Sequence, residues 1–228
     1  CNYRVRKGVG VTSQTVPTAP LTSDSDTQLL LDFTNASIID SSMENNIETV
    51  ADAHIDTSVK KFGTGSIQFD SVGDEIKMIN SPSQQPRTGP FTIEFFVYFS
   101  GTGNHGFFGN GTGGYYAQLF SGNFQFVQVA TANINIAWSY STGQWYHVAL
   151  TRDSSNNTKL FIDGTQLGST ATSDTLDYNN DTIALTIGDI GGNYNRRLYG
   201  YIDEFRLTKG VARHTSDFTA PTKAFPDK

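Results

Sequence analysis

The chain has 228 residues with a formal net charge of −6, and 37% of its residues are hydrophobic. This acidic balance leaves no basic stripe to neutralise phosphate groups, so a nucleic acid partner is not expected. The sequence contains no run of 18 or more apolar residues, so no membrane span is predicted. The single cysteine, Cys1, excludes an internal disulfide bond and a cysteine-based zinc site.

The first residues differ in character from the rest of the chain. Residues 1–28 are predicted to be an arm and a linker, because the strand-like segment Tyr3–Val11 precedes a polar stretch rich in Pro, Thr and Ser. Cys1 is either the lipidated residue left by lipoprotein signal cleavage or the start of a fragment. Short apolar segments then alternate with turns every 8–12 residues, so residues 29–228 are predicted to form one β-sandwich.

The clearest predicted strand is Phe91–Phe99, whose two faces are both largely apolar or aromatic, as expected of a central strand. Asp163-Gly164 is typical of a tight hairpin turn, and one helical turn is expected near Ser41–Asn46. The other predicted strands are Leu29–Phe33, Ser66–Phe69, Glu75–Ile79, Gly106–Asn110, Tyr115–Phe120, Asn123–Val129, Asn133–Trp138, Trp145–Arg152, Lys159–Ile162, Gln166–Ser169, Ala184–Ile187 and Leu198–Leu207.

One internal repeat joins the two ends of the chain. "RVRKGVGVTSQTVPTAPL" begins at Arg4, and "RLTKGVARHTSDFTAPTKAF" begins at Arg206. Both segments begin with Arg, an apolar residue, a variable residue and then Lys-Gly-Val. Thr-Ser follows in each of them, and then Pro-Thr shortly before an apolar residue. The arm therefore imitates the closing strand of the domain. It is the remnant of a preceding tandem module, or a strand that adds to the sheet edge of a neighbouring subunit, or else a disordered arm or one that docks on its own domain. Its candidate assembly residues are Tyr3, Val5, Val9 and Val11.

The acidic residues do not form a catalytic pattern. Glycoside hydrolysis needs two carboxylates that face one substrate bond, and Glu94 has no acidic neighbour in its strand. Asp203 and Glu204 are adjacent in a strand, so we expect their side chains to point to opposite faces and to accept structural hydrogen bonds. His147 lies in an apolar strand and is predicted to be packed. We therefore predict no enzymatic activity.

Three loop-like segments combine aromatic residues with Asn, Asp and Arg, which is the composition of a sugar-binding surface. They are residues 107–116, 136–145 and 191–201, and loops of this kind cluster at the ends of a sandwich. Packing in the core or at its rim is the alternative explanation for these aromatic rings. The candidate ligand-binding residues are Trp138, Tyr140, Tyr194, Arg196 and Arg197.

Several segments resemble the laminin-G-like family of concanavalin-A-like jelly-roll domains. They are "FGTGSIQFDSVGDEIKM" from Phe62, "FTIEFFVYF" from Phe91, "GQWYHVALTRDSSNNTKLFIDGTQLGS" from Gly143, and the closing segment from Tyr199 to Pro226. The resemblance covers about Leu29–Pro226 and implies an all-β, two-sheet antiparallel jelly-roll sandwich. The closing segment is also similar to tandem modules of marine bacteriophage structural proteins.

Many domains of this family hold a calcium ion at the rim of the sandwich, and calcium is the one cofactor that we expect. Calcium binds six to eight oxygen atoms from carboxylates, amides and loop carbonyls. The candidate ligands are Asp70, Asp74, Asp189 and Asp203. The alternative is that these aspartates form ordinary Asx turns.

Together these observations predict a non-catalytic module at an extracellular or virion surface. One interpretation is a structural or adhesive subunit of a fibre, decoration or filament, with copies of itself or other particle proteins as partners. The other is a calcium-assisted carbohydrate-binding module of a larger secreted protein, with cell-surface glycans as partners.

Overall fold

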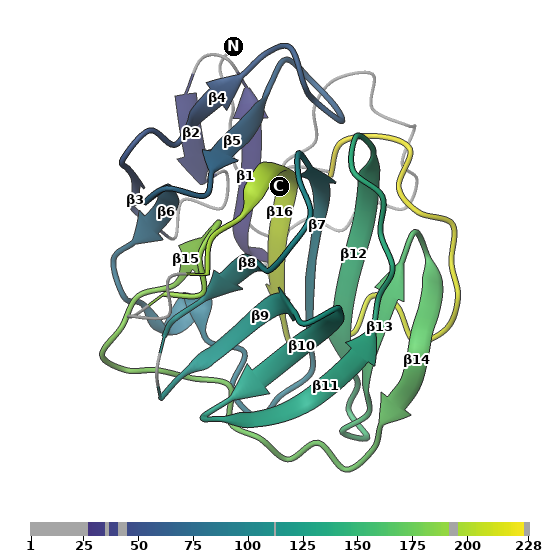
Figure 1. Cartoon of the computed structure of the whole chain (residues 1–228). Coiled ribbons are helices and arrows are strands. Elements are labelled where there is room, and N and C mark those ends of the chain that lie inside the picture. The colour runs from purple at the N-terminus through teal and green to yellow at the C-terminus, as the bar shows by residue number, and fades with distance from the viewer. Residues whose placement is uncertain (1–26, 35–36, 41–44, 112, 192–195, 226–228) are drawn as a thin grey trace, which may run out of the picture.

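The computed structural model describes residues 27–34, 37–40, 45–111, 113–191 and 196–225, with side chains from residue 40 onward. These residues form two antiparallel β-sheets packed face to face, which confirms the predicted sandwich (Figure 1). No helix in this part of the chain is long and apolar enough to cross a membrane. The predicted arm, with Tyr3, Val5, Val9 and Val11, lies outside the described residues, and so does Tyr194.

The larger sheet has nine strands in the order β14-β13-β12-β7-β16-β1-β2, with β5 paired to β16 and β4 paired to β5. As predicted, β7 is central, because it lies between β12 and β16. The strands of this sheet are β1 (Thr27–Thr34), β2 (Ser37–Asp40), β4 (His54–Asp56), β5 (Ser66–Asp70), β7 (Phe91–Phe99), β12 (Trp145–Arg152), β13 (Thr158–Ile162), β14 (Thr165–Ala171) and β16 (Tyr199–Lys209).

The smaller sheet has seven strands in the order β11-β10-β9-β8-β15-β6-β3. The predicted helical turn near residues 41–46 lies mostly outside the described residues, and β3 begins directly after it. The strands are β3 (Ile47–Val50), β6 (Glu75–Met78), β8 (His105–Gly109), β9 (Tyr115–Phe120), β10 (Asn123–Gln128), β11 (Thr131–Ala137) and β15 (Thr186–Ile187), and one turn of 3-10 helix spans Pro82–Gln84.

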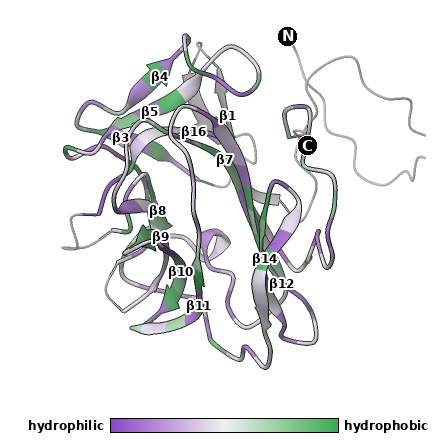
Figure 2. Cartoon of the chain, turned by 45° about the vertical axis from the view of Figure 1, so that its right-hand side comes forward, coloured by the Kyte–Doolittle hydropathy of each residue, from purple (hydrophilic) through white to green (hydrophobic). Residues whose placement is uncertain are grey.

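The core fills the space between the sheets. The odd-numbered side chains of β7, from Phe91 to Phe99, are all at most 1% exposed. Phe95 stacks on Phe205 of β16, with ring centroids 5.7 Å apart, and contacts Phe107 of the opposite sheet at 5.6 Å. The most hydrophobic segments in Figure 2, such as those of β7 and β10, face this space. Burial of these rings is the main stabilisation of the fold.

Trp145 does not join this core, although a tryptophan in so apolar a strand was expected to be a core residue. It is opposite Tyr98 on β7 and packs with Phe62 and Phe96 on the outer face of the nine-stranded sheet. Side chains alternate along a strand, so Trp145 shares the outer face with even-numbered residues of β7.

The segment after β16, residues 210–225, crosses this outer face, and we call it the C-terminal strap (Figure 1). Its backbone is tied to the sheet by Phe218 N–H, which donates to Gly164 O at 2.8 Å. Gly164 and Asp163 form the predicted hairpin turn between β13 and β14, both with positive φ. A Cβ atom on Gly164 would lie 2.0 Å from Phe218 O, so glycine is needed there for the strap to approach.

Candidate functional site

One end of the sandwich carries an open depression of about 430 Å³, which we call the rim depression. Its walls come from the loops that follow β7, β9 and β11. Hydroxyl and amide side chains alternate there with aromatic rings, and no lining residue is charged. The lining residues are Thr102, Gly103, Asn104, Leu119, Ser121, Gly122, Trp138, Ser139 and Tyr140.

Two hydrogen bonds tie the walls of the rim depression together. Ser121 N–H donates to Asn104 Oδ1 at 2.9 Å, and Trp138 N–H donates to Gly122 O at 3.0 Å. The first bond joins the loop after β7 to the turn after β9, and the second joins that turn to the end of β11. The depression is therefore formed before any ligand arrives, which lowers the entropic cost of binding.

Tyr140 is fixed in the wall of this depression and is half-buried. Its hydroxyl accepts a hydrogen bond from Gly103 N–H at 3.0 Å and lies 3.0 Å from His105 Nε2, while its ring packs on Phe99 with centroids 4.1 Å apart. Burial lowers the pKa of His105 to about 4, so this imidazole is neutral at pH 7. The rim depression therefore presents a fixed aromatic ring and no charge.

Trp138 lines the rim depression but is not the exposed ring that the sequence analysis expected. Its side chain is only 5% exposed and packs against the rings of Phe99, Phe107 and Phe124. The reason is the alternation of β11, because Ile134 and Ile136 already face the core and position 138 continues on the same side. Tyr140 is therefore the aromatic residue best placed to contact a ligand there.

The remaining candidates lie elsewhere. The Arg196 guanidinium lies 3.9 Å from the centre of the Phe120 ring and donates to Gln118 Oε1 at 2.5 Å, on the outer face of the seven-stranded sheet. Arg197 Nε lies 3.1 Å from a carboxylate oxygen of Asp189 and forms an ion pair with it. Of the four predicted ligand-binding residues that the structure describes, it thus brings together only Trp138 and Tyr140.

The four predicted calcium ligands are not gathered into one site. Asp74 accepts hydrogen bonds from Asp70 N–H and Asp52 N–H, both at 2.8 Å, while Asp203 of β16 accepts from the backbone N–H groups of Lys61 and Phe62 in the loop between β4 and β5. Asp189 is paired with Arg197, as described above. The part of the chain that the structure covers contains no group of three or more His, Cys, Asp or Glu residues placed to hold a metal ion. Calcium binding remains a prediction.

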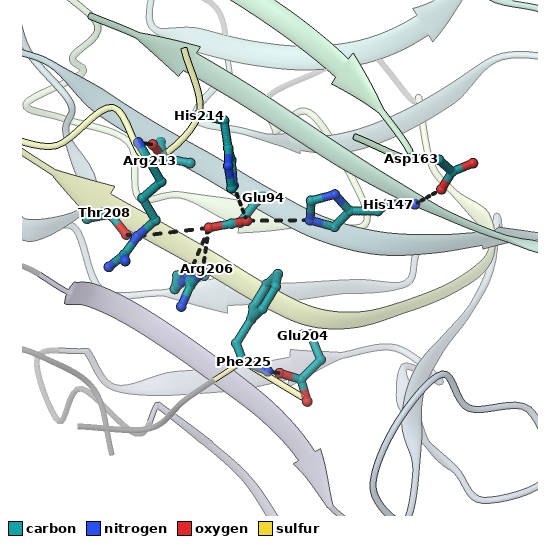
Figure 3. Close-up of polar contacts among 10 residues, drawn as sticks. Glu94, His147, Asp163, Glu204, Arg206, Thr208, Arg213, His214 and Phe225 are labelled. Carbon is teal, nitrogen blue, oxygen red and sulfur yellow. Dashed lines mark hydrogen bonds and ion pairs between the residues drawn. The ribbon is translucent and has the colours of Figure 1, made fainter. Parts of the chain in front are cut away.

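A buried carboxylate lies beneath the C-terminal strap (Figure 3). Glu94 Oε1 accepts from Arg206 Nε at 3.0 Å and from Arg206 Nη2 at 2.7 Å, and Oε2 lies 3.2 Å from His214 Nε2 and 3.4 Å from His147 Nε2. Burial by itself would raise the pKa of Glu94. The contacts with both histidines and the charge of Arg206 outweigh burial and hold this pKa well below its usual range.

This cluster is structural in its geometry. Glu94 is fully buried, so no substrate reaches it from solvent, and His214 belongs to the strap and stacks on Phe218 with ring centroids 3.6 Å apart. His147 is fully buried as well, which confirms the prediction that it is a packed residue. Glu94 stands out in the sequence as a lone acid, but its role as the anchor of the strap was not predicted, because its partners Arg206 and His214 are far away in the sequence.

Asp203 and Glu204 accept structural hydrogen bonds, as predicted, but they do not serve opposite faces. A register shift between β7 and β16 follows Asp203, and Glu204 has a φ of 56°. Asp203 therefore accepts from Phe62 N–H, and Glu204 accepts from Phe225 N–H (Figure 3). The rings of Phe62 and Phe225 both pack on Phe96. The irregularity lets two adjacent carboxylates hold two segments against one face.

Comparison with known families and structures agrees with the observed fold. A model of the concanavalin A-like lectin/glucanases superfamily matches residues 70–215. No curated protein sequence matches the chain. The binding domain of Paraclostridial Mosquitocidal Protein 1 has a TM-score of 0.67 and 17% identity, and the match covers 82% of this chain and 50% of that one.

Two further similar structures contain sugars. The botulinum neurotoxin serotype D ligand-binding domain in complex with N-acetylneuraminic acid has a TM-score of 0.62 and 16% identity, over 82% of this chain and 48% of that one. Domain 4 of AbnA, an extracellular arabinanase from Geobacillus stearothermophilus, in complex with arabinotriose, has a TM-score of 0.63 and 17% identity, over 85% of this chain and 95% of that one. The chain spans about half the length of the toxin domains, and at these identities the similarity shows the fold alone.

Proposed function

The chain belongs to the concanavalin A-like lectin/glucanases superfamily, and from this we propose that it is a non-catalytic module that binds glycans in the rim depression. The observation that carries the proposal is a preformed, uncharged depression in which the Tyr140 ring is held by Gly103, His105 and Phe99. Sugar rings combine apolar C–H faces with hydroxyl groups. They suit a site where a fixed aromatic ring lies among a few polar groups.

The polar groups of the rim depression favour an uncharged sugar. Asn104, Ser121 and Ser139 offer amide and hydroxyl groups, and the neutral His105 behind Tyr140 adds no charge. We therefore expect binding that changes little between pH 6 and 8. The sugar complexes of the neurotoxin domain and of the arabinanase domain support the proposal, because they show this fold holding sugars in those proteins.

The positions of the acidic residues support a binding role without turnover. Glu94 is enclosed under the strap and paired with Arg206, and no carboxylate lines the rim depression. A glycosidase of the usual kind needs two carboxylates on opposite sides of the scissile bond. The extracellular arabinanase domain among the similar structures supports a secreted or surface location for this module too.

A glycan array with and without calcium tests this proposal. Ser139→Trp places a large ring in the rim depression from an exposed position, and Thr142→Trp adds the same ring to the same loop outside the lining residues. We expect binding by the wild type and by Thr142→Trp, and at least about a tenfold loss in Ser139→Trp, or roughly 1.4 kcal/mol. Equal binding by all three proteins would show that the sugar does not use this depression.

A second candidate function, a structural module that joins like modules, is favoured by the repeat between the arm and the closing segment. In the closing segment, Arg206 pairs with Glu94, Lys209 Nζ donates to Pro82 O at 2.7 Å, and Thr92 Oγ1 donates to Val211 O at 3.0 Å. In the repeat, the residues that correspond to Arg206, Lys209 and Val211 are Arg4, Lys7 and Val9. The arm thus carries residue types that hold a closing segment on this fold.

Deleting residues 1–12 tests the second candidate. If the arm joins one copy to another, we expect the shortened chain to be a monomer that still unfolds cooperatively, while the full chain forms larger species in light scattering. A shortened chain that assembles as well as the full chain would rule out exchange of the arm.

A further inference from the structure

The outer face of the seven-stranded sheet carries a row of hydrogen-bonded amides. Gln118 on β9, Gln125 on β10 and Asn135 on β11 are direct cross-strand neighbours. Gln118 Nε2 donates to Gln125 Oε1 at 2.6 Å, and Gln125 Nε2 donates to Asn135 Oδ1 at 3.3 Å. Arg196 begins the row, because its Nη1 donates to Gln118 Oε1 at 2.5 Å. We call these four residues the amide row.

The direction of the amide row is fixed by its first member. A guanidinium has only donors, so Gln118 must present its oxygen to Arg196 and its NH₂ group to Gln125. Gln125 in turn accepts from Gln118 through its oxygen and donates its NH₂ group to Asn135. The oxygen of Asn135 is therefore the acceptor of the last hydrogen bond. The Asn135 side chain is exposed, and its free end is therefore an NH₂ group rather than a carbonyl.

The charge at the head of the row strengthens the donor at its end. Hydrogen bonds in a chain polarise one another, and Gln118 is only 2% exposed, so water screens the first links weakly. Each amide whose oxygen accepts a hydrogen bond from a strong donor becomes a better donor through its own NH₂ group, so the effect passes from Gln118 to Gln125 and then to Asn135. Asn135 Nδ2 is therefore a fixed donor with a known orientation.

Asn135 also lines a groove of about 300 Å³ between the edge strands β11 and β14. The two strands approach closely, because a Cβ atom on Gly168 would lie 2.7 Å from Ile136 Cγ2. The groove combines an apolar floor with hydroxyl and amide groups, and no lining residue is charged. Its lining residues are Asn133, Ile134, Asn135, Ile136, Ser169, Thr170 and Ala171.

We infer that this groove is a second binding site, for an uncharged oligosaccharide whose oxygen atom accepts a hydrogen bond from Asn135 Nδ2. The inference rests on the proposed glycan-binding function. Thr170 Oγ1 already accepts from Gln166 Nε2 at 3.2 Å, so its own proton is available to a ligand, and Ser169 is exposed beside it. The Asn135 amide at the rim of the groove, the two hydroxyl groups of β14 and the apolar side chains of Ile134 and Ile136 farther in match the ring oxygens, hydroxyls and C–H faces of a neutral sugar.

The side-chain amide signals of the full chain in a ¹H–¹⁵N spectrum test the site directly. Arabinotriose, cellotriose and maltotriose serve as probes at about 10 mM, well above the ~1 mM dissociation constant of a weak complex. We expect at least one probe to shift the Asn135 NH₂ signals. Asn135→Asp, which replaces the donor with a charged acceptor, should weaken that probe at least about tenfold. Asn46→Asp makes the same change beside β3, at the opposite edge of the sheet, and should have no effect.

The same spectrum tests the amide row without any ligand. Arg196→Met keeps a chain over the Phe120 ring but removes the donor, so the Asn135 NH₂ signals should move. Unmoved signals in Arg196→Met would disprove the relay, and the absence of any probe-induced shift at Asn135 would overturn the site.

Ser139→Trp separates the two proposals. If it removes array binding while Asn135 never responds to a probe, the rim depression stands and the groove is wrong. If Asn135 responds equally in wild type and Ser139→Trp while array binding is unchanged, the groove stands and the rim depression is wrong. If neither assay detects a sugar, both proposals fail.

Discussion

At the scale of single residues, Glu94 is the buried charge that ties the C-terminal strap to the nine-stranded sheet. Its isolation from other acids is visible in the printed sequence, and the prediction of no paired-carboxylate site rests on it. Its partner Arg206 is 112 residues away and meets it only because β7 and β16 pair in the nine-stranded sheet. Trp138 is the opposite case, because we predicted a surface residue although the alternation of Ile134, Ile136 and Trp138 in the sequence indicates a buried ring.

Removing the charge of Glu94 should destabilise the protein strongly. Glu94→Gln keeps the shape but leaves Arg206, whose side chain is only 9% exposed, without its ionic partner. Breaking one side of a buried ion pair costs about 3–5 kcal/mol. We expect urea denaturation at pH 7 to show a loss of this size. A loss under about 1 kcal/mol would mean that the strap does not depend on this carboxylate.

The same variant predicts a pH dependence. The pKa of Glu94 is lower in the folded protein than its ordinary value of 4.5, so the unfolded chain binds more protons there. Its stabilisation is complete above pH 4.5 and is lost as the pH falls toward the folded pKa. The stability gap between wild type and Glu94→Gln should therefore be smaller at pH 3 than at pH 5. An equal gap at both pH values would contradict the lowered pKa.

At the scale of elements, strands with a strong apolar pattern were predictable and irregular ones were not. The central strand β7 and the hairpin at Asp163-Gly164 follow from alternation and turn chemistry. The short strands β3 and β4 are half-exposed and carry little apolar pattern, so nothing marked them. The register shift after Asp203 comes from contacts with two distant segments, which no local pattern encodes.

The C-terminal strap should be held mainly by Phe225. Its side chain is 4% exposed and contacts Phe96, His147 and the Arg206 guanidinium. Phe225→Ala should lower the free energy of unfolding by about 3 kcal/mol, as for other buried phenylalanines. Val72→Ala, at a side chain that is 73% exposed, should change it by less than about 0.5 kcal/mol. Thermal unfolding of both variants gives the comparison, and equal effects would contradict the role of the strap.

At the scale of the whole molecule, the fold was more predictable than the site. Composition, strand spacing and the family resemblance sufficed for an all-β sandwich. The rim depression needed the structure, because its three loops come from different parts of the sequence and meet through the hydrogen bonds of Asn104, Gly122 and Tyr140. For the same reason the candidate ligand-binding and calcium-binding residues could be chosen only by residue type, and those that the structure describes do not meet in one ligand site or one calcium site.

The shared core predicts that one charge at its centre prevents folding. Phe95 is fully buried between rings of both sheets, so Phe95→Asp would bury a carboxylate with no partner. We expect the variant to be insoluble or to lack cooperative unfolding in circular dichroism. A soluble Phe95→Asp protein with a sharp transition would contradict the two-sheet core.

Equilibrium dialysis of the full chain against a mixture of neutral oligosaccharides, followed by mass spectrometry of the ligand recovered from the protein side, tests binding and lack of turnover together. A non-catalytic glycan-binding module should retain at least one oligosaccharide at unchanged mass after long incubation, and Ser139→Trp should retain less of it than Thr142→Trp. No enrichment on the protein side, or recovery of shortened oligosaccharides, would contradict the account.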